Sequence, residues 1–199
     1  ICENITYHVK SCREFKFLPG AKESLARLRQ LGLPIIVVTN QAIVNRGLAP
    51  AAAVEDIHAR MVAHITAAGG RIDRVIYCPH RPDERCRCRK PAPGMLRRAA
   101  SEMNLNLTGS YFVGDAATDL IAARQVGCRA FLVLTGRGVQ QLVPSFRAVG
   151  GQFTITRNLP GAVAHIFQLE AMPVAARRGG IVPSSVMAKS AWVRVAPEK

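Results

Sequence analysis

Short apolar runs alternate along the chain with segments whose apolar residues recur at helical spacing. The runs are rich in β-branched residues and are bounded by glycine and proline, which is typical of buried strands. We expect strands over residues 34–39, 74–78, 111–113, 129–134 and 153–155. We expect helices over residues 21–31, 50–68, 93–103, 118–126 and 161–170. This alternation predicts an α/β fold in which helices cover both faces of a parallel sheet, giving three layers.

The chain divides into a predicted domain and a tail. Residues 1–170 carry the alternating pattern and form one domain in this interpretation. Residues 171–199 contain several prolines and an Arg-Arg-Gly-Gly run, and they show no clear period. Such a segment is typical of a poorly ordered tail or of the start of an incomplete further segment.

Composition narrows the kind of partner. The chain has 27 Lys and Arg against 13 Asp and Glu, for a formal net charge of +14, which favours an anionic partner. Aromatic residues are only 6%, which leaves little surface for stacking on bases. We therefore expect a small anionic substrate and no nucleic acid. The sequence shows neither a long apolar span nor a signal-peptide pattern, so we expect no membrane partner and a cytoplasmic location. Because the basic chain carries few partner motifs, we expect a monomer.

Cysteines gather in one segment of the chain. Cys78, Cys86 and Cys88 lie within eleven residues, beside His80. Three thiols and one imidazole match the ligand set of a closed, structural zinc site, in which no position is left for a reactive water. Because the spacings are tighter than in the common zinc knuckle, incidental thiols beside a surface histidine are one alternative. A nucleic-acid-binding zinc module is another, although the predicted loop position of the cluster counts against it.

Polar side chains follow two of the predicted strands directly. In parallel sheets, ligands bind at the carboxyl ends of the strands. Thr39, Asn40 and Gln41 offer hydroxyl and carboxamide groups that suit a phosphate, although such residues also form ordinary turns. Asp115 can hold Mg²⁺, which prefers oxygen ligands. Asp119 lies in the first turn of a predicted helix, where interaction with the helix N-terminus is its alternative role.

A basic pair, Arg89 and Lys90, precedes Pro91 and a predicted helix. A guanidinium group binds phosphate as a fork, and an ammonium group binds it as a point charge. A solvated basic loop is the alternative interpretation. Each of these signals is modest alone, but their order along the chain is more specific.

That order resembles a known motif set. A strand followed by Thr-Asn, then Lys-Pro before a helix, then a strand followed by Gly-Asp-x-x-x-Asp is similar to the haloacid-dehalogenase superfamily. Val38-Thr-Asn-Gln41, the segment from Tyr77 to Met95 and the segment from Tyr111 to Ala123 resemble its histidinol-phosphate and heptose-bisphosphate phosphatase branch. The resemblance covers residues 1–170.

The resemblance implies a Rossmann-like core with a zinc-binding loop. It also implies Mg²⁺-dependent hydrolysis of a phosphomonoester on a sugar bisphosphate, through an aspartyl-phosphate. Histidinol-phosphate phosphatase activity and non-catalytic sugar-phosphate binding are the alternatives. The implied roles are phosphoryl binding by Thr39 and Asn40, charge neutralisation by Lys90, substrate contact by Arg89 and Gln41, Mg²⁺ binding by Asp115 with support from Asp119, and zinc binding by Cys78, His80, Cys86 and Cys88.

One motif of the superfamily has no counterpart here. Its members open with a strand that ends in Asp-x-Asp, whose first carboxylate attacks phosphorus and whose second acts as general acid and base. The sequence contains no Asp-x-Asp, and Ile1 aligns just after that motif. A covalent route needs a carboxylate nucleophile. We therefore expect the first strand to be missing and the chain as given to be inactive, through truncation of an active enzyme or degeneration of a binding domain.

Overall fold

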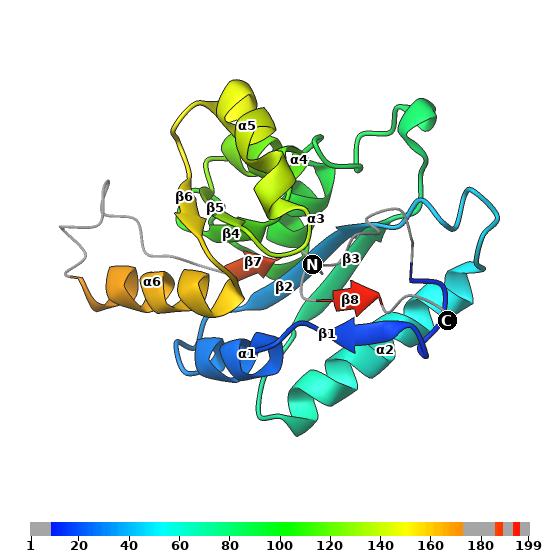
Figure 1. Ribbon diagram of the computed structural model, residues 1–199, viewed down its shortest axis with the longest axis horizontal. Helices are drawn as coiled ribbons and strands as arrows, with labels where there is room; N and C mark the ends of the chain where they lie inside the picture. The colour runs from blue at the N-terminus through cyan, green and yellow to red at the C-terminus, as the bar shows by residue number, and fades with distance from the viewer. Residues whose placement is uncertain (1–8, 173–185, 189–192, 196–199) are drawn as a thin grey trace.

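The computed structural model describes residues 9–172, 186–188 and 193–195 of the chain. Its main feature is a six-stranded sheet with the order β3-β2-β7-β4-β5-β6, in which every neighbouring pair is parallel (Figure 1). Its strands are β2 (Ile35–Asn40), β3 (Arg74–Cys78), β4 (Tyr111–Gly114), β5 (Arg129–Val133), β6 (Thr154–Thr156) and β7 (Val186–Ala188). A separate antiparallel pair consists of β1 (Phe15–Phe17) and β8 (Val193–Val195). The predicted parallel α/β fold is confirmed.

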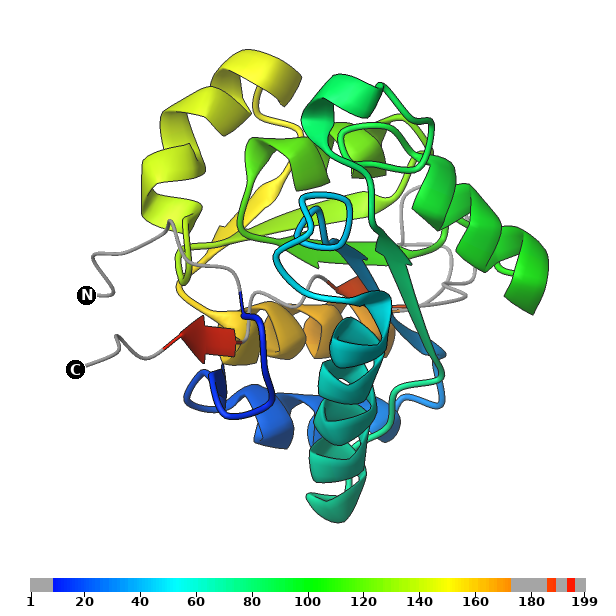
Figure 2. The ribbon, with the colours of Figure 1, turned by 90° about the vertical axis from the view of Figure 1, so that its right-hand side faces the viewer.

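Helices cover both faces of the large sheet (Figures 1 and 2). One face carries α1 (Ala21–Arg29), α2 (Ala51–Ala67) and α6 (Leu159–Ala171). The other face carries α3 (Gly94–Met103), α4 (Ala117–Arg124) and α5 (Gly138–Val149). A short 3₁₀ helix, η1 (Pro82–Glu84), lies in the loop after β3. The three expected layers are therefore present.

The two faces of β2 explain its uninterrupted apolar run. Ile35 and Val37 belong to the buried cluster under α1, α2 and α6, whereas Ile36 and Val38 belong to the cluster under α3 and α4. Successive side chains of a strand point to opposite faces, so a strand that is covered on both sides has no polar face. Such a strand can present polar groups only at its ends.

Helix α5 was not predicted from the sequence. Pro144 lies inside it, and glycines lie at both of its ends. Val139 and Val143 are exposed on its surface, so the apolar residues do not mark a buried stripe. Its formation depends on packing against α4, which local sequence patterns do not report.

Strand β7 comes from the segment that we expected to be a poorly ordered tail. Its backbone lies between β2 and β4, opposite Ile35–Val37 on one side and Tyr111–Val113 on the other. The Met187 side chain is fully buried in the cluster under α3 and α4. The central position of the sheet is thus taken by a strand from the C-terminal part of the chain. The rest of the predicted tail after Met172, apart from β8, lies outside the described residues.

None of the helices in the described part of the chain combines the length and the apolar character that a membrane span requires.

Candidate functional site

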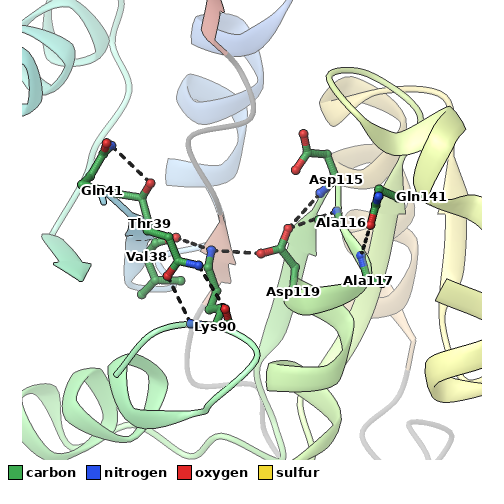
Figure 3. Close-up of polar contacts among 10 residues, drawn as sticks. Val38, Thr39, Gln41, Lys90, Asp115, Ala116, Ala117, Asp119 and Gln141 are labelled. Carbon is green, nitrogen blue, oxygen red and sulfur yellow. Dashed lines mark hydrogen bonds and ion pairs between the residues drawn. The ribbon is translucent and has the colours of Figure 1, made fainter. Parts of the chain in front are cut away.

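The carboxyl edge of the sheet brings together the ends of β2 and β4 and the loop that follows β3 (Figure 3). Lys90, from that loop, reaches between the two strands with a fully buried side chain. Its Nζ donates to the Val38 carbonyl oxygen at 2.7 Å and lies 3.0 Å from Oδ1 of Asp119. A charge in the protein interior is tolerated only when it is paired and hydrogen-bonded, and Lys90 meets both conditions.

Asn40 fixes the main chain of Lys90. Its Nδ2 donates to the Lys90 carbonyl oxygen, and its Oδ1 accepts from the Lys90 N–H, both at 3.1 Å. Thr39 is buried beside it, and Gln41 Nε2 donates to the Thr39 hydroxyl at 3.4 Å. The structure therefore brings these four predicted site residues together. Their contact with a phosphoryl group stays a prediction.

Asp119 holds the turn between β4 and α4. Its Oδ2 accepts the N–H groups of Asp115 at 3.2 Å and Ala116 at 3.1 Å, which are orphan donors at a helix start. Its other oxygen faces Lys90. Both oxygens of Asp119 thus have partners within the protein, which fits its predicted supporting role, while Mg²⁺ binding by Asp115 stays a prediction.

The Asp115 carboxylate lies against the loop after β5. Its Oδ2 accepts the Arg137 N–H at 3.1 Å. The neighbouring Gly136 has a φ of 62°, and a Cβ there would overlap that same carboxylate oxygen. Glycine is therefore required for the loop to come this close. A carboxylate held in this way at the end of a strand suits Mg²⁺, whose preferred ligands are oxygens.

Sequence reasoning missed two residues beside this site. Arg137 donates its main-chain N–H to Asp115 Oδ2. Gln141 Oε1 accepts the Ala117 N–H at 3.1 Å (Figure 3). The signal that could have pointed to them is the pair of glycines, Gly136 and Gly138, that follows the buried strand β5.

The predicted zinc ligands also come together. The ligand atoms of Cys78, His80, Cys86 and Cys88 all lie within 4.8 Å of one another. The Sγ–Sγ distances are 3.2 to 3.6 Å, and His80 Nδ1 lies 3.3 Å from Cys88 and 3.4 Å from Cys78. Zinc–sulfur bonds of about 2.3 Å give a tetrahedron with edges of about 3.8 Å, so the cluster fits one zinc ion.

The three thiols of this cluster differ in acidity. Burial raises the pKa of Cys78 and Cys88. Burial also acts to raise the pKa of Cys86, but hydrogen bonds from the Arg89 N–H and the neighbouring thiols outweigh it, and that pKa lies below its usual value. Metals bind thiolates, so Cys86 is the thiol best prepared for a cation.

We use the name zinc loop for residues 78–89, which carry the four predicted zinc ligands. Side-chain contacts join parts of this loop to one another and to the loop after β2. Arg89 Nη1 donates to the His80 carbonyl oxygen at 3.0 Å. Asn45 Nδ2 donates to the two oxygens of Glu84, at 2.9 and 3.1 Å. The zinc loop and the loop that follows Thr39 are thereby joined beside the sheet edge. The predicted contact of Arg89 with a substrate is not tested by this geometry and stays a prediction.

Comparisons with known proteins match this arrangement. A family model described as HAD-hydrolase-like matches residues 87–152. A D-glycero-beta-D-manno-heptose-1,7-bisphosphate 7-phosphatase of Pseudomonas putida is 43% identical over 135 residues, covering 68% of this chain and 77% of the relative. The Bordetella bronchiseptica protein of the same name is 42% identical over 134 residues, 67% of this chain and 75% of its own length.

Solved structures agree. The crystal structure of D,D-heptose 1,7-bisphosphate phosphatase from B. bronchiseptica, complexed with magnesium and phosphate, has a TM-score of 0.76 and 37% identity. It matches 81% of this chain and 89% of its own. The corresponding protein of Burkholderia thailandensis has a TM-score of 0.59 and 29% identity, over 75% of this chain and 85% of its own.

Fold, motif order and comparisons together define the class, which is that of the HAD-like phosphatases, hydrolases of phosphoric monoesters. Within that class, the chain belongs to the family of the D-glycero-D-manno-heptose-1,7-bisphosphate 7-phosphatases. The resemblance expected from the sequence is confirmed.

Proposed function

We propose that this chain carries the phosphate- and magnesium-binding machinery of a phosphomonoesterase that acts on heptose 1,7-bisphosphate at the 7-phosphate. The observation that carries the proposal is the buried pair of Lys90 and Asp119, placed between Thr39 and Asp115 at the carboxyl edge of the sheet. The names of the relatives support the choice of a heptose bisphosphate.

The chain's own groups suit a phosphoryl dianion. The Lys90 ammonium group places positive charge at the sheet edge, and Thr39 presents a buried hydroxyl at the end of β2 on the same edge. Preorganised donors of this kind offset the charge that spreads over the equatorial oxygens during phosphoryl transfer. Asp115 would hold Mg²⁺, which when bound supplies further positive charge for the same purpose. Asn40 keeps Lys90 in position through its main chain.

The zinc loop supports the substrate mouth in this proposal. Cys78, His80, Cys86 and Cys88 would hold a zinc ion with no open position, which fits shaping of a loop and not hydrolysis. The loop ends at Arg89 and leads directly into Lys90, so the bound metal would fix the position of the main chain at these two residues. We propose that Arg89 contacts the sugar phosphate.

The sequence contains no Asp-x-Asp motif, which is the motif that supplies the nucleophile in the resemblance described above. We therefore propose that the 199 residues bind the phosphorylated sugar without forming an aspartyl-phosphate. Monomeric, cytoplasmic action also stays a prediction, from the spread of charge and the sequence patterns alone.

Calorimetric binding tests the proposal without requiring turnover. Heptose 1,7-bisphosphate and histidinol phosphate are titrated into the chain with and without Mg²⁺, and hydrolysis is followed by phosphate release. We expect Mg²⁺-dependent binding that favours the heptose bisphosphate, with no release of phosphate. Stronger binding of histidinol phosphate would reassign the substrate, and phosphate release by the chain alone would refute the proposed inactivity.

An isosteric variant connects the binding to the site. Thr39→Val removes the hydroxyl, and a hydrogen bond to a charged group is worth about 1.5–3 kcal/mol, so we expect affinity to fall about tenfold or more. Thr66→Val is the matched control, because Thr66 is exposed on α2, away from the sheet edge that carries Thr39. Equal affinities of the two variants would place phosphate binding elsewhere.

A further inference from the structure

The start of α4 is held partly by a side chain from a different helix. Three successive main-chain N–H groups at this turn, those of Asp115, Ala116 and Ala117, need acceptors. Asp119 accepts the first two, and Gln141 Oε1 accepts the third at 3.1 Å. Ala116, at the cap position itself, has no side-chain acceptor to offer. Gln141 therefore supplies, from α5, the acceptor for a main-chain N–H in the first turn of α4.

The same turn of α5 also contacts the Asp115 carboxylate. Arg137 donates its N–H to Asp115 Oδ2 at 3.1 Å, and Gln141 N donates to the Arg137 carbonyl oxygen at 3.0 Å. The contact with Asp115 and the contact with Ala117 are thus one helical turn apart on one rigid element. Helix α5 and its cap thus contact this turn twice, at the carboxylate of Asp115 and at the main-chain N–H of Ala117.

Glycines allow α5 to begin this close to the site. A Cβ at Gly136 would overlap Asp115 Oδ2, and a Cβ at Gly138 would overlap the carbonyl oxygen of Val133. The start of α5 therefore packs closely against the ends of β4 and β5. A small shift of α5 would move the main-chain N–H that the Asp115 carboxylate accepts.

We propose that Gln141 is a positioning residue, which holds the turn from Asp115 to Ala117 in the conformation in which Asp115 binds a divalent cation. This inference rests on the proposed function, because it takes Asp115 as a magnesium ligand. Gln141 acts through the backbone and touches neither the cation nor the phosphate in this role. Residues that orient metal ligands typically change metal affinity by about 10–100-fold when they are substituted.

The test compares two adjacent glutamines of α5. Gln141→Leu removes the acceptor at similar volume, and Gln140→Leu makes the same change at an exposed position. Mg²⁺ affinity is measured on the whole chain from the rise in unfolding temperature with Mg²⁺ concentration. We expect Gln141→Leu to weaken Mg²⁺ binding about tenfold and Gln140→Leu to leave it unchanged. Gln141→Glu, which keeps the acceptor, should restore the affinity.

A second measurement separates positioning from general stability. Amide exchange at Ala117 should rise about fivefold in Gln141→Leu, the effect of losing about 1 kcal/mol of hydrogen bonding, while phosphate affinity at saturating Mg²⁺ stays the same. If Gln141→Leu does not fold, Gln141→Met provides the same loss of acceptor on an unbranched side chain.

Two negative outcomes are distinguishable. Equal Mg²⁺ affinity of the unchanged protein, Gln141→Leu and Gln140→Leu would overturn the positioning role alone. Absence of any Mg²⁺ effect on the unchanged protein would count against the proposed function, and the positioning role would fall with it.

Discussion

The zinc loop lies beside a second region, the edge site, which consists of Thr39, Asn40, Lys90, Asp115 and Asp119 at the carboxyl edge of the sheet. The chain forms these two regions in opposite ways. All four ligands of the zinc loop come from one segment, Cys78 to Cys88. The edge site takes its groups from the end of β2, the loop before α3, the turn before α4 and the start of α5. The first is a local structure that a metal can complete, whereas the second exists only when the sheet has formed.

The electrostatic character of the two regions differs accordingly. The Lys90–Asp119 pair is fully buried, and each charge depends on the other. The ligands Cys86, Cys88 and His80 are only partly buried, so water can reach the loop when the metal is absent. We therefore expect a substitution in the zinc loop to affect the structure of that loop alone, and a substitution in the Lys90–Asp119 pair to lower the stability of the whole fold.

Substitution of Asp119 by asparagine should have the largest effect. The oxygen of the introduced carboxamide can replace Oδ2 toward the two backbone N–H groups, but the amide nitrogen then faces the Lys90 ammonium group, donor against donor. Breaking one side of a buried pair costs about 3–5 kcal/mol. We expect urea unfolding to show a loss of that size in the free energy of unfolding, while the slope of that free energy against urea concentration stays unchanged.

The double variant Lys90→Met/Asp119→Leu tests whether the cost comes from a buried charge that has lost its partner. Replacement of both partners by apolar residues leaves no such charge, so the loss in free energy of unfolding should be smaller than the sum of the losses in Lys90→Met alone and Asp119→Leu alone. Additive costs would show that Lys90 and Asp119 do not interact, and the comparison with the zinc loop would lose its basis.

Truncation of Met187 tests whether β7 supports the sheet beneath the edge site. β7 lies between β2, which ends in Thr39 and Asn40, and β4, which Asp115 follows; because the Met187 side chain is fully buried, Met187→Ala should cost about 2–5 kcal/mol in the free energy of unfolding. Met172→Ala, at a residue exposed beyond the end of α6, should have little effect. Equal unfolding midpoints for the two variants would remove β7 from the core of the sheet.

The same contrast explains what could be predicted from the sequence. The zinc ligands were recognisable because their spacing is local, and the strands β2, β4 and β5 because burial on both faces leaves a nearly continuous apolar run. The placement of Thr39 and Asp115 followed from the rule that ligands bind at the carboxyl ends of parallel strands.

What could not be predicted depends on partners far away in the chain. β7 is three residues long, too short to show a period, and its position is defined only by β2 and β4. Helix α5 exposes Val139 and Val143, so its hydrophobic pattern does not point inward. Gln141 had no motif of its own, because its partner is a backbone N–H on another helix.

Loss of one zinc ligand should have a smaller and local effect. Cys86→Ser removes the thiol with the lowered pKa, and the protein purified with zinc should no longer retain it stoichiometrically by elemental analysis. Cys12→Ser, outside the cluster, should retain the metal. We expect the free energy of unfolding to fall by about 1–2 kcal/mol, within the range of ordinary substitutions, and proteolysis to begin between β3 and α3. A loss as large as that of Asp119→Asn would break the comparison.

The pH dependence of stability should show the smallest effect, through His58 on the face of the sheet that α2 covers. His58 of α2 is buried against Tyr77, with ring centroids 5.5 Å apart, and its Nε2 has no hydrogen-bond partner among the described residues. Burial lowers the pKa of His58, and nearby Glu55 offsets this only in part. The folded protein therefore keeps the ring neutral at a pH where the unfolded chain, with a pKa of about 6.5, already binds a proton.

Stability should consequently fall as the pH drops below about 6.5, with a slope of at most about 1.4 kcal/mol per pH unit from this group. Above that pH both states are neutral and His58 contributes no slope. His58→Phe removes the titration, so its free energy of unfolding relative to the unchanged protein should rise steadily as the pH falls from about 7 to about 5, because titrations common to both proteins cancel. His64→Phe, at an exposed position of the same helix, is the matched control. If the two variants show parallel pH profiles, burial of His58 has no energetic consequence.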